Sequence, residues 1–395
     1  MKFDVVQLES TGIDVIDGDR GKNYPHQNEL LDTGFCLFLS AKNVTKSGFN
    51  FFETKFISQR KDALLKNGKL KRGDIVITTR GTVGNVALYS PQIFYDNVRI
   101  NSGMLIIRCT NNISNQYLYQ VLRSEWFQKQ IMAVQSGSAQ PQLPKSHFLK
   151  MYIPLPSLPI QEKIASILQL IDDKVMTNNA INNNLLQQLH VLYLRLFCDS
   201  AMDTPLGDVV ATTSGGTPSR KHDEYYSDSS ICWVKSKELV GNYIQETEEH
   251  INDLAIKESS AKYLPEHSVL IAMYGATVGA YGVISKPMTC NQAVCALLCN
   301  KNYPYTYLFQ IAYESQQQFI NLAVGSAQQN ISQVLIKQLN LHSDLDIIQK
   351  FHGFALPMHK EIESLQAENM RLSALRDNLL PKLMSGELDV SNIEI

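Results

Sequence analysis

Residues 160–197 read IQEKIASILQLIDDKVMTNNAINNNLLQQLHVLYLRLF, and apolar residues recur along them at alternating spacings of four and three. This heptad pattern predicts one long helix with a single apolar seam. At about 1.5 Å per residue, such a helix is about 57 Å long. The seam positions, eight of ten apolar, are Ile164, Leu168, Ile171, Val175, Asn178, Asn182, Leu185, Leu189, Leu192 and Leu196.

The same pattern returns 187 residues later, from Ile347 onward. Its seam positions, again eight of ten apolar, are Phe351, Ala355, Met358, Ile362, Leu365, Asn369, Leu372, Arg376, Leu379 and Leu383. Asn182 and Asn369 fall at the same place in the two copies, and a buried Asn in such a seam commonly fixes register and partner orientation. Seams repeated in phase favour an antiparallel coiled coil with pseudo-twofold symmetry; the alternative is that each helix packs on its own domain. Pro357 and Pro381 predict a kink or a break in the second helix.

Upstream of each helical pattern lies a second set of repeated sequences. Gly-Ser-Ala-Gln occurs at residues 137–140 and 325–328, and Gly81–Gly84 has a partner in Gly275–Gly279. Offsets that drift by only a few residues over so long a span indicate a duplicated unit. The sequence therefore predicts an α+β chain with two pseudo-repeated mixed α/β domains, residues 1–158 and 201–344. Helical segments 159–200 and 345–395 follow them.

Composition places the chain among ordinary soluble proteins. It is 44% hydrophobic and 19% charged, and it has no run of 18 apolar residues that would predict a membrane span. The start, Met1-Lys2-Phe3-Asp4, lacks an apolar signal core, so we expect a cytoplasmic protein without a membrane partner. The seven cysteines form no CxxC pair, which favours reduced thiols. Cys290, Cys295 and Cys299 cluster in a strand-like run and are interpreted as small buried residues rather than zinc ligands.

Charge differs between the two predicted domains. Residues 1–158 hold 19 Lys and Arg against 12 Asp and Glu, whereas residues 201–344 hold 9 against 14. A basic first domain suggests a polyanionic partner. In the acidic second domain, positive residues are concentrated between Arg220 and Lys237, so a local basic patch is expected there.

Polar, Gly-rich loops surround the strand patterns, at residues 17–22 in the first domain and 212–221 in the second. Such loops offer backbone N–H groups, hydroxyls and cations that suit phosphate and base-edge contact, although ordinary surface turns need the same residue types. On composition alone, the two interpretations are equally supported. The candidate DNA-binding residues in and beside the loops are Arg20, Lys22, Lys42, Lys46, Arg80, Lys145, Ser214, Thr217, Ser219, Arg220, Lys221, Lys235, Lys237 and Tyr274.

Sequence motifs for catalysis and cofactor binding are missing. The chain contains no GxxxxGK[ST], GxGxxG, HExxH or GxSxG motif, no Asn/Asp-Pro-Pro-aromatic tetrapeptide, and no paired histidine spacing for a metal. His222, beside Asp223 and Glu224, is interpreted as part of a surface loop. We therefore expect a binding protein without catalytic residues, bound cofactor or metal of its own.

Several of these stretches together resemble a known family. They are Leu206–Val210, Ser214–Ser219, Tyr225-Tyr226 and Ile231–Leu239, together with Arg80–Gly84, both Gly-Ser-Ala-Gln copies, Leu158–Ala165 and Leu379–Leu388. In this order they resemble the specificity subunit of type I restriction–modification systems, over essentially the whole chain. One departure is Asp346–Lys350, which lacks the Pro-Leu-Pro lead-in found before the first helix.

The resemblance implies a division of labour. Each domain would be a target recognition domain that binds one half of a bipartite sequence in double-stranded DNA, and the paired helices would set the unread spacer. Two modification (methyltransferase) subunits would dock along the helices and bring S-adenosylmethionine. Restriction (translocase and nuclease) subunits would join that core.

Three other interpretations stay open on the sequence. The chain could be the specificity subunit of a type IIB-like system, which shares the architecture, or a coiled-coil adaptor that binds other proteins instead of DNA. It could also be a fused enzyme that both recognises and methylates DNA, against which the missing cofactor motifs count. Steep salt dependence separates DNA binding from the adaptor, and cofactor binding by the isolated chain tests the fused enzyme.

Overall fold

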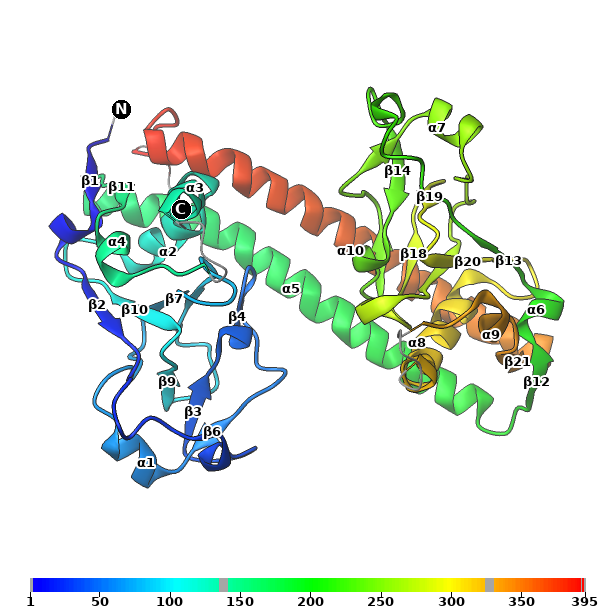
Figure 1. The fold of residues 1–395 in the computed structure, drawn as a ribbon, viewed down its shortest axis with the longest axis horizontal. Coiled ribbons are helices and arrows are strands. Elements are labelled where there is room, and N and C mark those ends of the chain that lie inside the picture. The colour runs from blue at the N-terminus through cyan, green and yellow to red at the C-terminus, as the bar shows by residue number, and fades with distance from the viewer. Residues whose placement is uncertain (1–2, 135–140, 324–329, 392, 394–395) are drawn as a thin grey trace. The chain divides into compact units, whose positions relative to one another are not determined.

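The computed structural model describes residues 3–134, 141–323, 330–391 and 393. The chain forms two compact units: residues 1–174 with 372–395, and residues 175–371. Each unit therefore combines one globular domain with part of each long helix (Figure 1). Both Gly-Ser-Ala-Gln copies lie outside the described residues.

The first unit is built on an antiparallel sheet of order β2-β10-β7-β8. These strands are Asp14–Asp17, Met104–Arg108, Ile75–Thr78 and Val86–Leu88. Both faces of the sheet are buried, which explains its continuous apolar runs. In β10, Leu105 and Ile107 contact the core beneath α2 (Asn115–Arg123) and α3 (Glu125–Val134), whereas Met104 and Ile106 belong to a second core.

That second core is shared with smaller sheets. Strand β3 (Cys36–Leu39) pairs antiparallel with β6 (Phe56–Ile57) and parallel with β9 (Val98–Ile100). A hairpin of β4 (Val44–Thr45) and β5 (Gly48–Phe49) packs nearby. The described part of this domain also contains β1 (Val5–Gln7), which pairs with β11 (Tyr152–Pro154), and helices α1 (Gln59–Leu64) and α4 (Lys145–Leu149).

The second unit repeats this plan with additions. Its main sheet has the order β13-β20-β17-β18, extended by β15, which runs parallel to β18. These strands are Ala211–Ser214, Val294–Leu298, Val269–Ala272, Tyr281–Ile284 and Asn242–Ile244. One 19-residue helix, α8 (Tyr305–Ala323), stands where the first unit has α2 and α3. Its other strands and short α-helices in the described residues are β14 (Ile231–Val234), β16 (His250–Ile251), β19 (Thr289–Cys290), β12 (Met202–Pro205), β21 (Asn340–His342), α6 (Leu206–Val209), α7 (Asp253–Glu258) and α9 (Gln333–Lys337).

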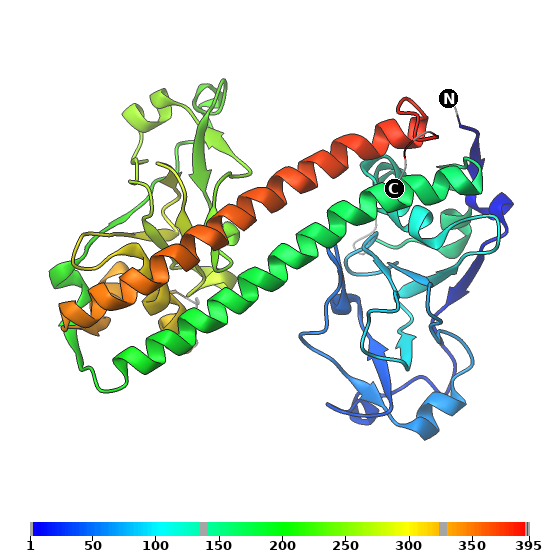
Figure 2. The same cartoon turned by 180° about the vertical axis from the view of Figure 1, so that it is seen from behind.

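The long helices are α5 (Leu158–Phe197) and α10 (Leu345–Ser385). In each unit they run antiparallel: Arg376 pairs with Asp172 in the first, and the ring of Phe351 contacts that of Phe197 in the second. Figure 2 shows the last turns of α10 beside the first turns of α5. All twenty seam positions are buried or half-buried. The predicted antiparallel pairing is confirmed, and the seam residues at both ends also join the domain cores.

Two details of the helices differ from the sequence expectations. A kink or a break was predicted at Pro357 and Pro381; helix α10 continues through both, so the break does not occur. Both prolines lie on the exposed face, where each removes one backbone N–H without disturbing the buried seam. Asn369, for its part, accepts a hydrogen bond from Asn178 Nδ2 at 2.9 Å and donates to Asn179 Oδ1 at 2.9 Å. Asn182 is thus its counterpart in the repeat, whereas Asn178 and Asn179 are its partners.

Candidate nucleic-acid interface

The Gly-rich loops of the two domains have the same backbone role. A Cβ on Gly18 would lie 2.1 Å from the carbonyl oxygen of Asn101, and one on Gly215 would lie 1.9 Å from that of Cys290. Both glycines are buried and allow the loop to pack directly against Asn101, which follows β9, and Cys290, which ends β19. These glycines are therefore packing residues, and the exposed loop positions that follow them are the ones available to a ligand.

Those exposed positions carry different side chains in the two domains. Arg20 pairs with Asp17 Oδ1 at 3.0 Å, and its Nη2 donates to the carbonyl of Ser102 at 3.5 Å. Thr217, two residues after Gly215 as Arg20 is two after Gly18, is hydrogen-bonded to Gln292. Lys22 and its counterpart Ser219 are exposed. The loop is held in the same way in each domain, while the chemistry that it displays differs.

A second pair of counterpart loops follows β7 and β17. Arg80 forms an isolated bridge with Gln142, and Tyr274 forms the equivalent bridge with Asn330. Both residues are exposed, and each precedes a glycine with positive φ, 74° at Gly81 and 69° at Gly275. Only glycine adopts such angles readily, so the turn is fixed by the backbone and leaves the preceding side chain variable.

A third pair lies in two short 3-10 helices, η3 (Ala41–Asn43) and η5 (Ser236–Glu238). Lys42 pairs with Glu53 at 3.2 Å, and Lys237 pairs with Glu248 at the same place in the second domain. Lys46, in the β4–β5 turn, is exposed and makes no ion pair with any residue that the structure describes.

Two of the predicted DNA-binding residues, Lys145 and Ser214, make contacts within the domains. The Lys145 ammonium donates to the carbonyl of Val15 across the domain. Its counterpart, Gln333, donates to the hydroxyl of Thr212 at 2.8 Å. Ser214 is half-buried in β13, where it is paired with Cys295 of β20. Lys145 and Ser214 thus belong to the frame that holds the loops.

The basic patch predicted in the second domain is largely neutralised. Arg220 and Lys235 both pair with Glu249, and the Arg220 guanidinium stacks 4.4 Å from the ring centroid of Tyr226 and 5.4 Å from that of Trp233. The Lys235 ammonium, together with Arg220, holds the pKa of Glu249 below its usual range. Lys221 is the exposed cation of this patch that makes no ion pair with a described residue. The prediction of a basic patch counted these cations but not Glu248 and Glu249, which pair with them in the structure.

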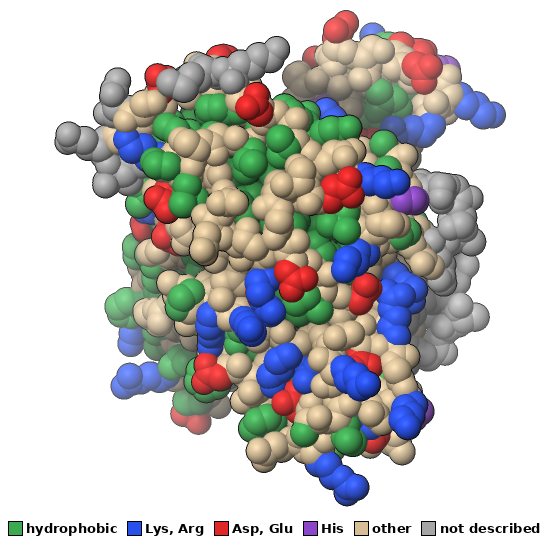
Figure 3. Space-filling model, turned by 90° about the vertical axis from the view of Figure 1, so that its left-hand side faces the viewer, with side chains coloured by type: hydrophobic (Ala, Val, Ile, Leu, Met, Phe, Trp, Pro, Cys, Tyr) green, Lys and Arg blue, Asp and Glu red, His purple; other side chains and the backbone are tan. Residues whose placement is uncertain are grey.

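The first domain has more exposed Lys and Arg side chains without an ion pair to a described residue than the patch of the second domain has. Some of them were not predicted from the sequence. Residues 18–72 hold eleven Lys and Arg against five Asp and Glu. Figure 3 shows Lys and Arg side chains, in blue, gathered over the lower half of the face that it draws. Exposed cations of this segment whose side chains pair with no described residue are Lys22, Lys46, Arg60, Lys66 and Lys71. The last three lie outside Gly-rich loops and were therefore not among the predicted contacts.

Two exposed aromatic residues accompany this surface. Phe52, 93% exposed, directly precedes Glu53, the partner of Lys42. Phe94, 89% exposed, packs edge-on against Tyr95, which also contacts Phe51. Exposed aromatic rings beside cations suit stacking on bases or insertion between them. The sequence signal that would have found Phe52 is an aromatic pair, Phe51-Phe52, inside a polar segment.

No helix in the described part of the chain combines the length and the apolar character that crossing a membrane requires.

His222, as the sequence suggested, is exposed, and its Nδ1 lies 2.8 Å from a carboxylate oxygen of Glu224. Cys290 and Cys295 are buried and Cys299 is half-buried.

Comparison with known proteins identifies both domains. Residues 11–187 and 201–343 match the model of the type I restriction modification DNA specificity domain. The MjaIX specificity subunit of Methanocaldococcus jannaschii is 25% identical over 355 residues, which cover 82% of this chain and 79% of that protein. The HindI specificity subunit of Haemophilus influenzae is 22% identical over 458 residues, which cover 94% of this chain and 98% of that protein.

A solved structure shows the same fold. The S subunit of the type I restriction–modification system from M. genitalium superposes with a TM-score of 0.58 at 14% identity, over 99% of this chain and 97% of that one. The matched domains account for most of the chain. The chain therefore belongs to the family of type I restriction–modification specificity subunits.

Proposed function

We propose that each domain binds one half of a bipartite sequence in double-stranded DNA through the exposed residues of its counterpart loops, which are the Gly-rich loops, the turns after β7 and β17, and the helices η3 and η5. The observation that carries this proposal is the set of counterpart loops, whose backbones are fixed alike while their exposed residues differ. Arg20 stands opposite Thr217 in the repeat, and Arg80 opposite Tyr274. A frame that repeats while its displayed side chains change suits two related domains that recognise different bases.

The chain itself supplies recognition in this proposal, and its partners supply chemistry. Two modification subunits dock along α5 and α10, bind S-adenosylmethionine and transfer the methyl group, and restriction subunits join that complex. The names of the relatives, which are specificity subunits of restriction enzymes, support these partners. The chain binds no S-adenosylmethionine and carries no catalytic residue.

Reconstitution tests this division directly. DNA, labelled S-adenosylmethionine and the purified chain should give no methyl transfer, and adding the modification subunit should start it. Transfer by the chain alone, or cofactor binding by it, would favour a fused enzyme. Binding of the complex to DNA should also weaken steeply with salt, because released counterions dominate such affinities. A flat salt response would identify a protein adaptor instead.

The antiparallel helices set the spacer in this proposal. Four residues inserted after Asn179 in α5, and four after Ala367 opposite it in α10, lengthen the pair by about 6 Å and nearly preserve the seam. The spacer of the modified sequence should then grow by one or two base pairs, at about 3.4 Å each. Two-residue insertions at the same sites should abolish assembly, because they rotate the seam off its partner. An unchanged spacer in the four-residue variant would show that the helices do not set it.

A further inference from the structure

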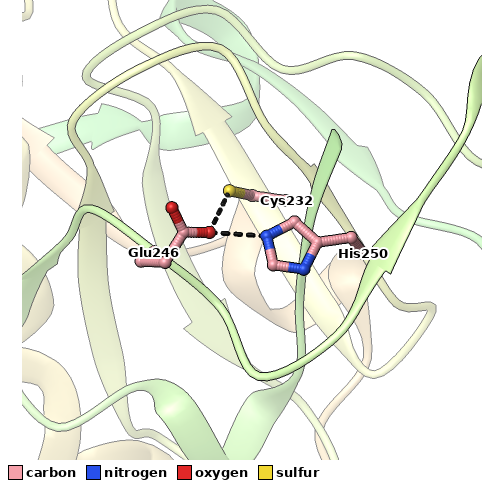
Figure 4. A group of neighbouring side chains, drawn as sticks. All are labelled: Cys232, Glu246 and His250. Carbon is pink, nitrogen blue, oxygen red and sulfur yellow. Dashed lines mark hydrogen bonds and ion pairs between the residues drawn. The ribbon is translucent and has the colours of Figure 1, made fainter. Parts of the chain in front are cut away.

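Three side chains with metal-ligating atoms meet at one edge of the second domain. Cys232 in β14 and His250 in β16 are directly opposite each other in antiparallel register, so both side chains lie on the same face of that sheet. Glu246, four residues before His250, turns back toward them from the loop after β15 (Figure 4). The sulfur, a ring nitrogen and a carboxylate oxygen lie within 4.8 Å of one another.

The hydrogen bonds within this group converge on one oxygen. Glu246 Oε1 lies 3.0 Å from Cys232 Sγ and 2.6 Å from His250 Nε2. Each of these bonds places a proton between two atoms that could both bind a cation. The other oxygen, Oε2, accepts from the Lys286 ammonium at 3.2 Å, which orients the carboxylate. With no proton on Sγ or Nε2, these two atoms and Oε1 would offer three lone pairs within 4.8 Å of one another.

Accessibility and donor type favour a particular class of ion. Cys232 is buried, whereas the side chains of His250 and Glu246 are 28% and 47% exposed, so an ion could enter from solvent and keep a fourth, water ligand. Thiolate, imidazole and carboxylate together suit Zn²⁺ or a similar borderline-soft ion, and disfavour Mg²⁺ and Ca²⁺.

We propose that Cys232, Glu246 and His250 bind one Zn²⁺ ion, with water as the fourth ligand. Binding releases the Cys232 thiol proton to solvent and moves the His250 ring proton from Nε2 to Nδ1, so that a thiolate, a neutral imidazole and the Glu246 carboxylate form the Zn–S, Zn–N and Zn–O bonds. This revises the expectation of a chain without metal. The spacing of the three residues matches no familiar zinc motif, because strand register rather than sequence proximity brings Cys232 to His250.

The site would fasten the segment that neutralises the candidate DNA-binding cations. Between the ligands Glu246 and His250 lie Glu248 and Glu249, which pair with Lys237 and with Arg220 and Lys235. A metal bound at both ends of this segment would hold those acids in place. We therefore place the ion beside the proposed DNA interface and give it a positioning role.

Metal titration of the purified, metal-free full chain tests the site. Co²⁺ replaces Zn²⁺ as a spectroscopic probe, since a thiolate ligand gives a sulfur-to-cobalt charge-transfer band. We expect one equivalent of Co²⁺ to produce that band and Zn²⁺ to abolish it. Cys232→Ser and His250→Gln should each weaken Zn²⁺ binding by more than the roughly 10–100-fold cost of losing an outer partner.

Matched controls separate this site from adventitious binding. Cys198→Ser removes an exposed thiol, and His222→Gln removes an exposed histidine that also contacts a glutamate. Both should bind one Zn²⁺ like the wild type, with the same thermal shift on adding metal. Circular dichroism must show each variant folded, and Glu246→Gln, which changes no volume, provides a third ligand variant. Absence of stoichiometric binding by the wild type, or binding that survives Cys232→Ser and falls in Cys198→Ser, would overturn the proposal.

Discussion

The two domains share a frame and differ in what they display. Glycines that allow close backbone contact, positive-φ turns and one ion pair, Lys42–Glu53 in the first domain and Lys237–Glu248 in the second, recur at counterpart positions. The first domain presents several exposed cations that pair with no acid among the described residues, whereas in the second domain Glu249 pairs with both Arg220 and Lys235. Backbone requirements thus preserve the frame, and the freedom left to exposed residues permits two different surfaces.

The same contrast appears where the long helices meet each domain. At counterpart positions in the repeat, α5 carries Asp172 and α10 carries His359. Asp172 pairs with Arg123 at 2.9 Å and Arg376 at 3.0 Å, whereas buried His359 Nδ1 lies 2.6 Å from the Tyr243 hydroxyl. At this position the long helix of the first unit contacts its neighbours through ion pairs, whereas that of the second unit does so through a hydrogen bond between neutral groups.

The largest predicted effect concerns the charged cluster. Asp172→Ala should destabilise the first unit by about 3 kcal/mol, because it leaves two partly buried arginines without their carboxylate. Glu162→Ala, an exposed position on the same helix, should change stability by less than about 0.5 kcal/mol.

The two tryptophans allow this loss to be assigned to one unit. Trp126 lies in the first unit and Trp233 in the second, so Trp233→Phe leaves a reporter in the first unit alone. Urea unfolding followed by Trp126 fluorescence then measures the effect. An equal loss of stability for Asp172→Ala and Glu162→Ala would show that the cluster contributes nothing.

A smaller effect should appear in the second unit on acidification. Burial, with repulsion from His352 and His267, lowers the pKa of His359 to about 3. The unfolded chain then binds the proton first, so His359 destabilises the folded unit as pH falls below about 6.5, by about 2 kcal/mol at pH 5. Asp172, whose folded pKa is lowered from an already acidic value, contributes no loss in this window.

The histidine contribution is isolated by comparing pH dependences. His267 acts in the opposite direction, because pairing with the Glu363 carboxylate, 3.7 Å away, raises its pKa. In a Trp126→Phe background, His359→Gln should therefore remove about 2 kcal/mol of the stability difference between pH 7 and pH 5, whatever its effect at pH 7. Parallel pH profiles for the two proteins would contradict the buried neutral histidine.

The smallest effect concerns DNA affinity. In the complex with the modification subunit, Lys22→Ala with Lys46→Ala should reduce the slope of log affinity against log salt by about 2, close to one per phosphate contact. Arg220→Ala with Lys237→Ala should reduce it less, because those cations must first leave Glu249 and Glu248. Fluorescence anisotropy over a salt series measures both slopes. If the second pair proves the more important, the acids of that patch do not compete with phosphate.

Sequence patterns predicted the features that depend on local periodicity. The heptads located α5 and α10 and their buried faces, and the repeated glycines located the counterpart turns. Contacts between distant residues could not be predicted in this way. The pairing of Asn369 with Asn178 depends on the antiparallel register, and the meeting of Cys232 with His250 depends on strand pairing. Likewise, the count of cations between Arg220 and Lys237 did not include Glu249, because the acid comes from another loop.

The central claim, that each domain recognises its own half of a bipartite target, is tested most directly by sequencing the methylated DNA. The complex of this chain with its modification subunits should methylate one sequence made of two specific parts and an unread spacer. Residues 201–344 are then exchanged for the matching domain of another family member. We predict that one part of the sequence changes while the other part and the spacer stay the same. A change in both parts, or an unchanged sequence, would contradict the account.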